Sequence, residues 1–82
     1  MAITNKNNRI DEMTWRKEFT KLLHNKLKCT GITQEQLAVE TGISRITINK
    51  YLDQRATPSG YHLNLIAEYL RCSVSELADI RQ

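Results

Sequence analysis

Residues 34–53 read QEQLAVETGISRITINKYLD, and this stretch decides the fold. Ala38 supplies a small side chain where two helices can cross closely, and Gly42 supplies the left-handed backbone that a very tight turn needs. Ser44 follows as a hydroxyl residue suited to cap the helix that begins after it. The spacing therefore predicts two short helices, the first ending at about residue 41 and the second running to about residue 53.

The second of these helices has two chemically different sides. At roughly 100° per residue, one side collects the apolar positions Ile48, Tyr51 and Leu52. The opposite side carries Arg45, Ile46, Asn49 and Lys50. Arginine and lysine donate to guanine acceptors, asparagine pairs both ways with adenine, and isoleucine can lie against a thymine methyl. The outward side therefore favours the reading of base edges in a DNA major groove.

Apolar residues at three- and four-residue spacing predict one helix before this pair and two after it. The first spans about residues 13–29, with a basic outer side and the stripe Trp15, Phe19, Leu22, Leu23 and Leu27. The fourth carries the stripe Leu63, Ile66, Ala67 and Leu70, and the fifth has Leu77 and Ile80 inward. Because nothing alternates with period two, the predicted fold is all-α, a compact domain of five helices.

Capping residues stand at the ends of these predicted helices. Asp11 suits the start of the first helix, and Gly31 suits its end. Ser59 is the expected cap of the fourth helix. Two capping boxes, in which a hydroxyl and a Glu or Gln three residues later satisfy each other's backbone N–H groups, are predicted at Thr33 with Gln36 and at Ser73 with Glu76.

Length and composition bound the rest of the chain. Its 82 residues suit one small domain, and we expect a flexible arm over residues 1–12 followed by a single domain over 13–82. The composition is ordinary for a soluble protein, and the formal net charge of +3 points away from acidic partners. No apolar run is as long as a membrane span, and residues 1–10 lack a signal-peptide core, so we expect a cytoplasmic protein with no membrane partner.

No residue pattern indicates catalysis or metal binding. His24 and His62 have no sequence neighbour placed to make either a catalytic base or a ligand, and both are predicted at the surface. Cys29 and Cys72 lack the paired spacing of a zinc site, so we expect free thiols, with Cys29 exposed at a helix end. We therefore predict no catalytic residue, no metal, no cofactor and no enzyme activity.

Taken together, these elements resemble the Cro and lambda-repressor type of helix-turn-helix protein, the XRE family. The resemblance covers about residues 19–80. It rests on ITQEQLA, the turn TGISR, ITINKYL, the TPS before the fourth helix and the closing LRCSVSEL. It implies a lambda-repressor-like helix-turn-helix domain that binds double-stranded DNA in a sequence-specific way, with the third helix as the recognition helix.

The resemblance also implies individual roles. Ser44, Arg45, Ile46 and Lys50 match the positions of base readers, and Thr47 and Asn49 can reach bases or the flanking phosphates. Thr33 and Gln34 at the start of the second helix and Arg55 after the third match phosphate contacts. Cys72 stands where the family usually buries an aliphatic side chain, so the resemblance implies that it packs in the core.

The sequence departs from the family at three positions. Gln54 stands where glycine is usual, which leaves the exit of the recognition helix open by a residue or two. Thr41 replaces a common apolar residue before the turn, and Gly60 replaces a common aliphatic one in the fourth helix. We expect the latter two to lower stability without disturbing the proposed contacts.

Two local questions stay open at the level of sequence. Lys6 and Arg9 in the arm can belong to a disordered terminus or can contact the minor groove or phosphates. Tyr61, Leu65 and Tyr69 recur every four residues on the fourth helix, away from its core stripe, and either pack in the core or form a dimer or partner surface.

Two functions are compatible with these features. The first is a transcriptional regulator, a phage or prophage repressor or Cro-like protein, which binds a pseudo-palindromic operator as a weak homodimer formed through this domain itself. The second is an antitoxin or anti-repressor, a protein-interaction module that uses the same scaffold to capture another protein. The donor pattern on the third helix favours the first, and the apolar stripe on the fourth favours the second.

Overall fold

The described residues, 11–78 of a computed structural model, form five helices and contain no strand. In chain order the helices are α2 (Glu12–Thr30), α3 (Gln34–Thr41), α4 (Arg45–Leu52), α5 (Gly60–Tyr69) and α6 (Val74–Ala78). The predicted all-α class is confirmed. Residues 1–10, which include Lys6 and Arg9 of the predicted arm, and residues 79–82, which include Ile80, lie outside the described part of the chain.

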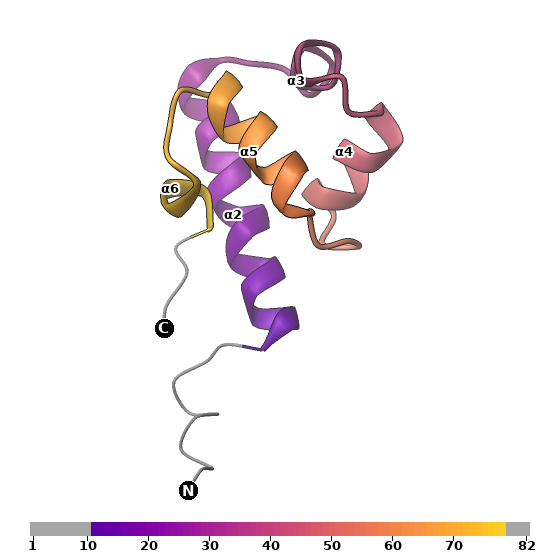
Figure 1. The fold of residues 1–82 in the computed structure, drawn as a ribbon, viewed down its shortest axis with the longest axis vertical. Helices are drawn as coiled ribbons and strands as arrows, with labels where there is room; N and C mark the ends of the chain where they lie inside the picture. The colour runs from indigo at the N-terminus through magenta and orange to yellow at the C-terminus, as the bar shows by residue number, and fades with distance from the viewer. Residues whose placement is uncertain (1–10, 79–82) are drawn as a thin grey trace, which may run out of the picture.

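The long helix α2 organises the arrangement (Figure 1). α4 packs against one side of α2 and α6 packs against the other. α3 contacts both α4 and α5, and α5 in turn contacts α6. The first turns of α2 extend beyond the other helices, so that its later turns carry most of the packing. This arrangement leaves α4 at the edge of the molecule, with one side available to a ligand.

All five helices contribute to one hydrophobic core. The side chains that are fully buried come from each helix in turn and are Phe19, Leu23, Leu37, Ile48, Ile66 and Leu77. Burial of such a side chain contributes about 1.5–3 kcal/mol, so the core positions predicted from helical spacing account for much of the folding free energy. Two predicted stripe residues, Trp15 and Leu22, are only half-buried, and Trp15 stacks on Phe19 with ring centroids 5.6 Å apart.

The predicted caps are present at the start of each helix. Asp11 accepts a hydrogen bond from the backbone N–H of Thr14 at 2.8 Å, and Ser59 caps α5. Both predicted capping boxes form, the one at Thr33 with bonds of 2.8 and 3.0 Å and the one at Ser73 with bonds of 3.2 and 3.4 Å. These bonds satisfy N–H groups that have no partner inside a helix.

Two glycines end helices in the left-handed conformation that the sequence predicts. Gly31 closes α2 at φ 76° and Gly42 closes α3 at φ 77°. Two other residues adopt positive φ without being glycine, namely Gln54 at 63° and Arg71 at 57°. A side chain in this region strains the backbone by about 1–2 kcal/mol. Gln54, which stands where the family usually has glycine, therefore adopts the left-handed conformation that glycine favours and strains the backbone by doing so.

Candidate nucleic-acid interface

The recognition helix proposed from the sequence is α4, and it is held by one side only. Ile48, Tyr51 and Leu52 are buried against the other helices, with at most 8% of any of these residues exposed. On the opposite side Arg45 and Lys50 are exposed, and Ile46 is 68% exposed. Thr47 and Asn49 flank this side and are half-buried. The outward and inward sides predicted from a 100° period therefore match the structure.

The turn before α4 is held by polar and apolar contacts at once. Ile43 is buried in the corner with 4% exposed, as its place after Gly42 requires. Thr41, which stands where an apolar residue is common, donates its hydroxyl to the backbone oxygen of Leu37 at 2.6 Å. The Thr41 hydroxyl oxygen in turn accepts a hydrogen bond from the backbone N–H of Ile43 at 3.3 Å. Thr41 therefore satisfies its hydroxyl within the turn, which offsets the loss of an apolar side chain.

Ser44 is exposed, but its hydroxyl already serves the helix. It accepts a hydrogen bond from the backbone N–H of Thr47 at 3.1 Å and donates to the Thr47 hydroxyl oxygen at 2.9 Å. The Ser44 hydrogen is thus engaged, whereas the Thr47 hydroxyl hydrogen stays available to an acceptor. Of these two predicted DNA contacts, Thr47 therefore has a hydroxyl hydrogen available for DNA, whereas the Ser44 hydroxyl caps the helix.

The predicted phosphate contacts lie at the start of α3 and just after α4. Thr33 caps α3 through its oxygen and keeps its hydroxyl hydrogen, and Gln34 is the first helical residue and is half-buried. Arg55 is exposed and lies 3.3 Å from the Asp53 carboxylate. Such an exposed ion pair contributes little to stability, so a phosphate can compete with Asp53 for the guanidinium.

Arg16 of α2 forms hydrogen bonds that hold the segment after α4 in place. Its guanidinium donates to the backbone oxygen of Gln54 at 3.3 Å and to the Thr57 hydroxyl at 3.0 Å. It also pairs with Glu12 at 2.9 Å, and Thr57 donates to the same carboxylate at 2.8 Å. Hydrogen bonds from Thr57 and Arg16 hold the pKa of Glu12 below its ordinary value. Because Gln54 and Thr57 lie on either side of Arg55 in the chain, this cluster holds the backbone at Arg55 in place.

Two further side chains of α2 reach the carboxyl end of α4. Thr20, which is buried, donates its hydroxyl to the backbone oxygen of Tyr51 at 2.7 Å. His24 donates through Nε2 to the backbone oxygen of Leu52 at 3.0 Å. Sequence reasoning assigned neither role. A threonine between Phe19 and Leu23 on a core-facing side is a signal that could have indicated a buried hydrogen bond.

The prediction that His62 is a simple surface residue is wrong. His62 is half-buried, and its Nδ1 shares a hydrogen bond of 2.6 Å with the Tyr51 hydroxyl, so this pair joins α5 to α4. Burial raises the pKa of Tyr51 above its ordinary value, which favours the neutral phenol. The sequence could not indicate this contact, because residues 51 and 62 belong to different helices and meet only when α4 and α5 pack together.

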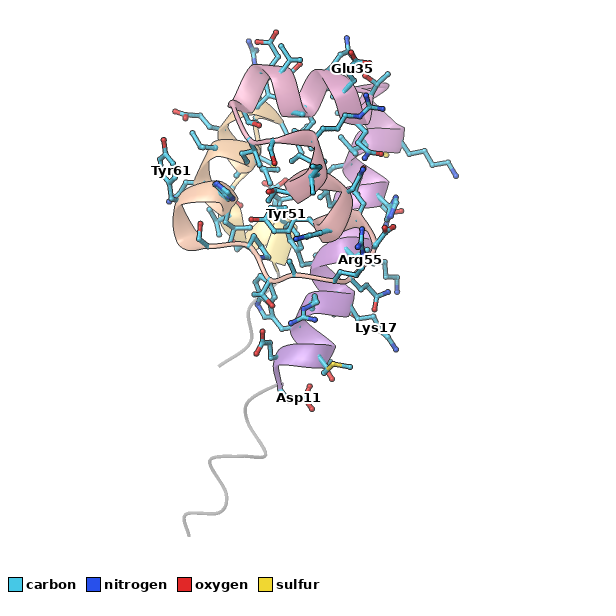
Figure 2. The ribbon with its side chains drawn as sticks, turned by 90° about the vertical axis from the view of Figure 1, so that its right-hand side faces the viewer. Asp11, Lys17, Glu35, Tyr51, Arg55 and Tyr61 are labelled. Carbon is cyan, nitrogen blue, oxygen red and sulfur yellow. The ribbon has the colours of Figure 1, made fainter. Side chains whose placement is uncertain are left out.

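The stripe on α5 divides between the core and the surface. Leu65 and Tyr69 are half-buried and pack against the core, whereas Tyr61 is 71% exposed. In Figure 2 Tyr61 lies on the opposite side of the molecule from Arg55 and Lys17. Cys72 is half-buried beside the core and Cys29 is exposed, as expected for both thiols, and burial raises the pKa of Cys72.

The family model for helix-turn-helix domains matches residues 30–77, more than half of the 82 residues. No curated protein and no solved structure matches the chain. None of the helices in residues 11–78 is long and apolar enough to cross a membrane. The matched family is one of DNA-binding domains, not of enzymes. With α3, the turn at Gly42 and α4 all inside the matched range, the chain belongs to the XRE-type helix-turn-helix family of DNA-binding regulators.

Proposed function

We propose that this protein is a phage or prophage repressor or Cro-like regulator that acts in the cytoplasm and binds a specific double-stranded DNA operator. The observation that carries the proposal is the division of α4 into a buried side and an exposed donor side. A helix anchored in this way can enter the major groove as a rigid body. Repression follows by exclusion of polymerase from the same DNA.

Direct readout is assigned to the exposed side of α4. Arg45 and Lys50 have donors for guanine O6 and N7, and Asn49 has the amide that pairs with adenine. Ile46 offers an apolar surface to a thymine methyl, and its 68% exposure leaves that surface accessible. Ser44 and Thr47 complete the proposed set at the start of the helix, with Thr47 as the hydroxyl donor.

Phosphate contacts are assigned to the two ends of the motif. Thr33 and Gln34 lie at the start of α3, where the helix dipole favours an anion. Arg55 lies after α4, on the segment that Arg16 fastens. Contacts of this kind set the register of α4 in the groove and do not distinguish sequences.

The proposed operator is pseudo-palindromic, because two copies related by a two-fold axis present two recognition helices to half-sites about 34 Å apart. The candidate contact between copies is Tyr61 with the adjoining edges of Leu65 and Tyr69. Since two of these residues are already partly covered by the core, the surface they leave is small. The homodimer is therefore expected to be weak in the absence of DNA.

Selection of bound duplexes from a randomised library at near-physiological salt tests the proposal. Enrichment of two mirrored half-sites one helical turn apart is the expected result. Enrichment of a single half-site would leave the DNA-binding role intact and contradict the dimeric operator.

The exposed Tyr61 supports a second candidate, an antitoxin or anti-repressor that captures another protein through α5. Failure of a folded sample to enrich any duplex would favour this function over the first. A Tyr61→Ser variant that then lost capture of its partner would assign the contact to α5.

A further inference from the structure

The outer side of α2 carries a row of basic residues that the family match does not include. Lys17, Lys21, His24 and Lys28 follow one another at intervals of four, three and four residues. At helical periodicity this spacing places them on one side of α2, and we call them the basic stripe. The family match begins at residue 30, after the last of them.

The charges of the basic stripe are poorly balanced by the described residues. Its three lysines are exposed, and none of them forms an ion pair within residues 11–78. The nearby carboxylates of Glu12 and Asp53 are paired with arginines, which leaves Glu18 as the local negative charge. Like charges four residues apart destabilise a helix by about 0.2–0.5 kcal/mol, so the stripe is not an arrangement that folding favours.

The basic stripe is continuous with the end of the recognition helix. Lys17, Lys21 and His24 line an open hollow of about 490 Å³. Leu52, the last residue of α4, and Gln54, two residues beyond it, line the same hollow. His24 is tied to that end by its hydrogen bond to the Leu52 oxygen. Figure 2 shows Lys17 and Arg55, the residue after Gln54, on the same side of the molecule. A DNA strand that contacts Arg55 can therefore continue along the same side of the molecule to the basic stripe.

We propose that the basic stripe binds backbone phosphates of the DNA that flanks the half-site read by α4. The inference rests on the proposed function and extends its interface from the helix-turn-helix motif to α2. The twelve helical residues from Lys17 to Lys28 span about 16 Å, and phosphates on one strand follow each other about every 3.4 Å along the duplex axis. The stripe is thus long enough to face several phosphates, and its charge is complementary to them.

The test compares two double variants with the same loss of charge. Lys17→Gln with Lys21→Gln removes two charges of the stripe while it keeps helix propensity. Lys26→Gln with Arg71→Gln removes two charges elsewhere, since Lys26 faces Glu76 of α6 and Arg71 follows α5. Both variants and the unchanged protein are first checked for equal thermal unfolding. Binding is then measured at several salt concentrations to a selected duplex that either ends at the site or extends one helical turn beyond it.

The stripe variant is expected to lower the slope of log Kobs against log salt by about 1.8, or about 0.9 per lost phosphate contact, on the extended duplex. On the trimmed duplex and in the control variant the slope should change little. Equal slopes for the two variants on the extended duplex, with specific binding by the unchanged protein, would overturn the inference alone. If the unchanged protein enriches no duplex, the proposed function and the inference both fail.

Discussion

The hydroxyl of Thr20 donates to the backbone oxygen of Tyr51 across 2.7 Å, although the two residues are 31 positions apart. The last carbonyl groups of a helix have no partner inside it. In α4 one is satisfied by Thr20 and the next by His24, and both donors belong to α2. The long helix therefore holds the end of the recognition helix in place, and Arg16 of the same helix holds the segment that follows.

Replacement of Thr20 by valine should destabilise the protein by about 1–3 kcal/mol, because the buried Tyr51 oxygen loses its short hydrogen bond. That oxygen keeps only the longer bond from the backbone N–H of Gln54 at 3.4 Å. Valine has nearly the same shape, so packing losses are small. Thr20→Ser keeps the hydroxyl and should recover much of the difference. Urea unfolding measures both, and equal loss in the two variants would show that packing, not the hydrogen bond, is what Thr20 contributes.

Replacement of Gln54 by glycine should stabilise the protein by about 0.5–1 kcal/mol. The change removes about 1–2 kcal/mol of strain at φ 63° and adds about 0.5–1 kcal/mol of unfolded-state entropy. Gln54→Ala serves as the control, since it removes the side chain and keeps the strain. A glycine variant that unfolds at the same urea concentration as the alanine variant would argue against strain at this position.

The roles assigned to α3 and α4 predict different losses of DNA affinity. Arg45→Ala should cost roughly 1–3 kcal/mol on the selected site and relax the preference at one base pair. Gln34→Ala should weaken binding to all sequences alike, because a phosphate contact carries no sequence information. Affinities for the selected and a scrambled duplex at one salt concentration distinguish the two. The assignment fails if both variants lose equally on both duplexes.

Acid should weaken the Arg16 cluster. Hydrogen bonds from Thr57 and Arg16 place the pKa of Glu12 below its ordinary value of 4.5 in the folded protein. A lowered pKa contributes stability above the unfolded value, and this is lost as pH falls through the folded value. Glu12→Gln should therefore show a shallower fall of the thermal midpoint below about pH 4.5.

Glu40→Gln is the matched control for that series, since the Glu40 carboxylate forms neither a hydrogen bond nor an ion pair with the described residues. Its acid profile should follow that of the unchanged protein. Parallel profiles for the Glu12 and Glu40 variants would mean that the cluster does not respond to acid.

The proposed contact between copies predicts a selective effect of Tyr61→Arg. Because Tyr61 is 71% exposed, the variant should fold with unchanged stability. Its affinity for a single half-site should also be unchanged, whereas cooperative binding to two half-sites should weaken. Gel-shift titrations on both duplexes measure this, and retained cooperativity would place the dimer contact elsewhere.

Much of the helical framework is predictable because it depends on neighbours in the chain. The caps at Thr33, Ser44 and Ser73 are satisfied by residues three positions away, and Gly42 ends α3 through its own backbone freedom. The sides of α4 follow from a 100° period. The individual base and phosphate contacts are predictions of a different kind, because they depend on the sequence and shape of a second molecule as well as on this chain.

The sequence by itself determined the five helices, their ends and their apolar sides, since these depend on interactions within one or two helical turns. Only the tertiary structure decided that Thr20 and His24 hold the end of α4, that His62 serves Tyr51, and that the basic stripe adjoins Arg55. These relationships join residues from different helices. Periodicity shows which side of a helix is buried, but not which partner covers it, because the partner is set by how all five helices pack at once.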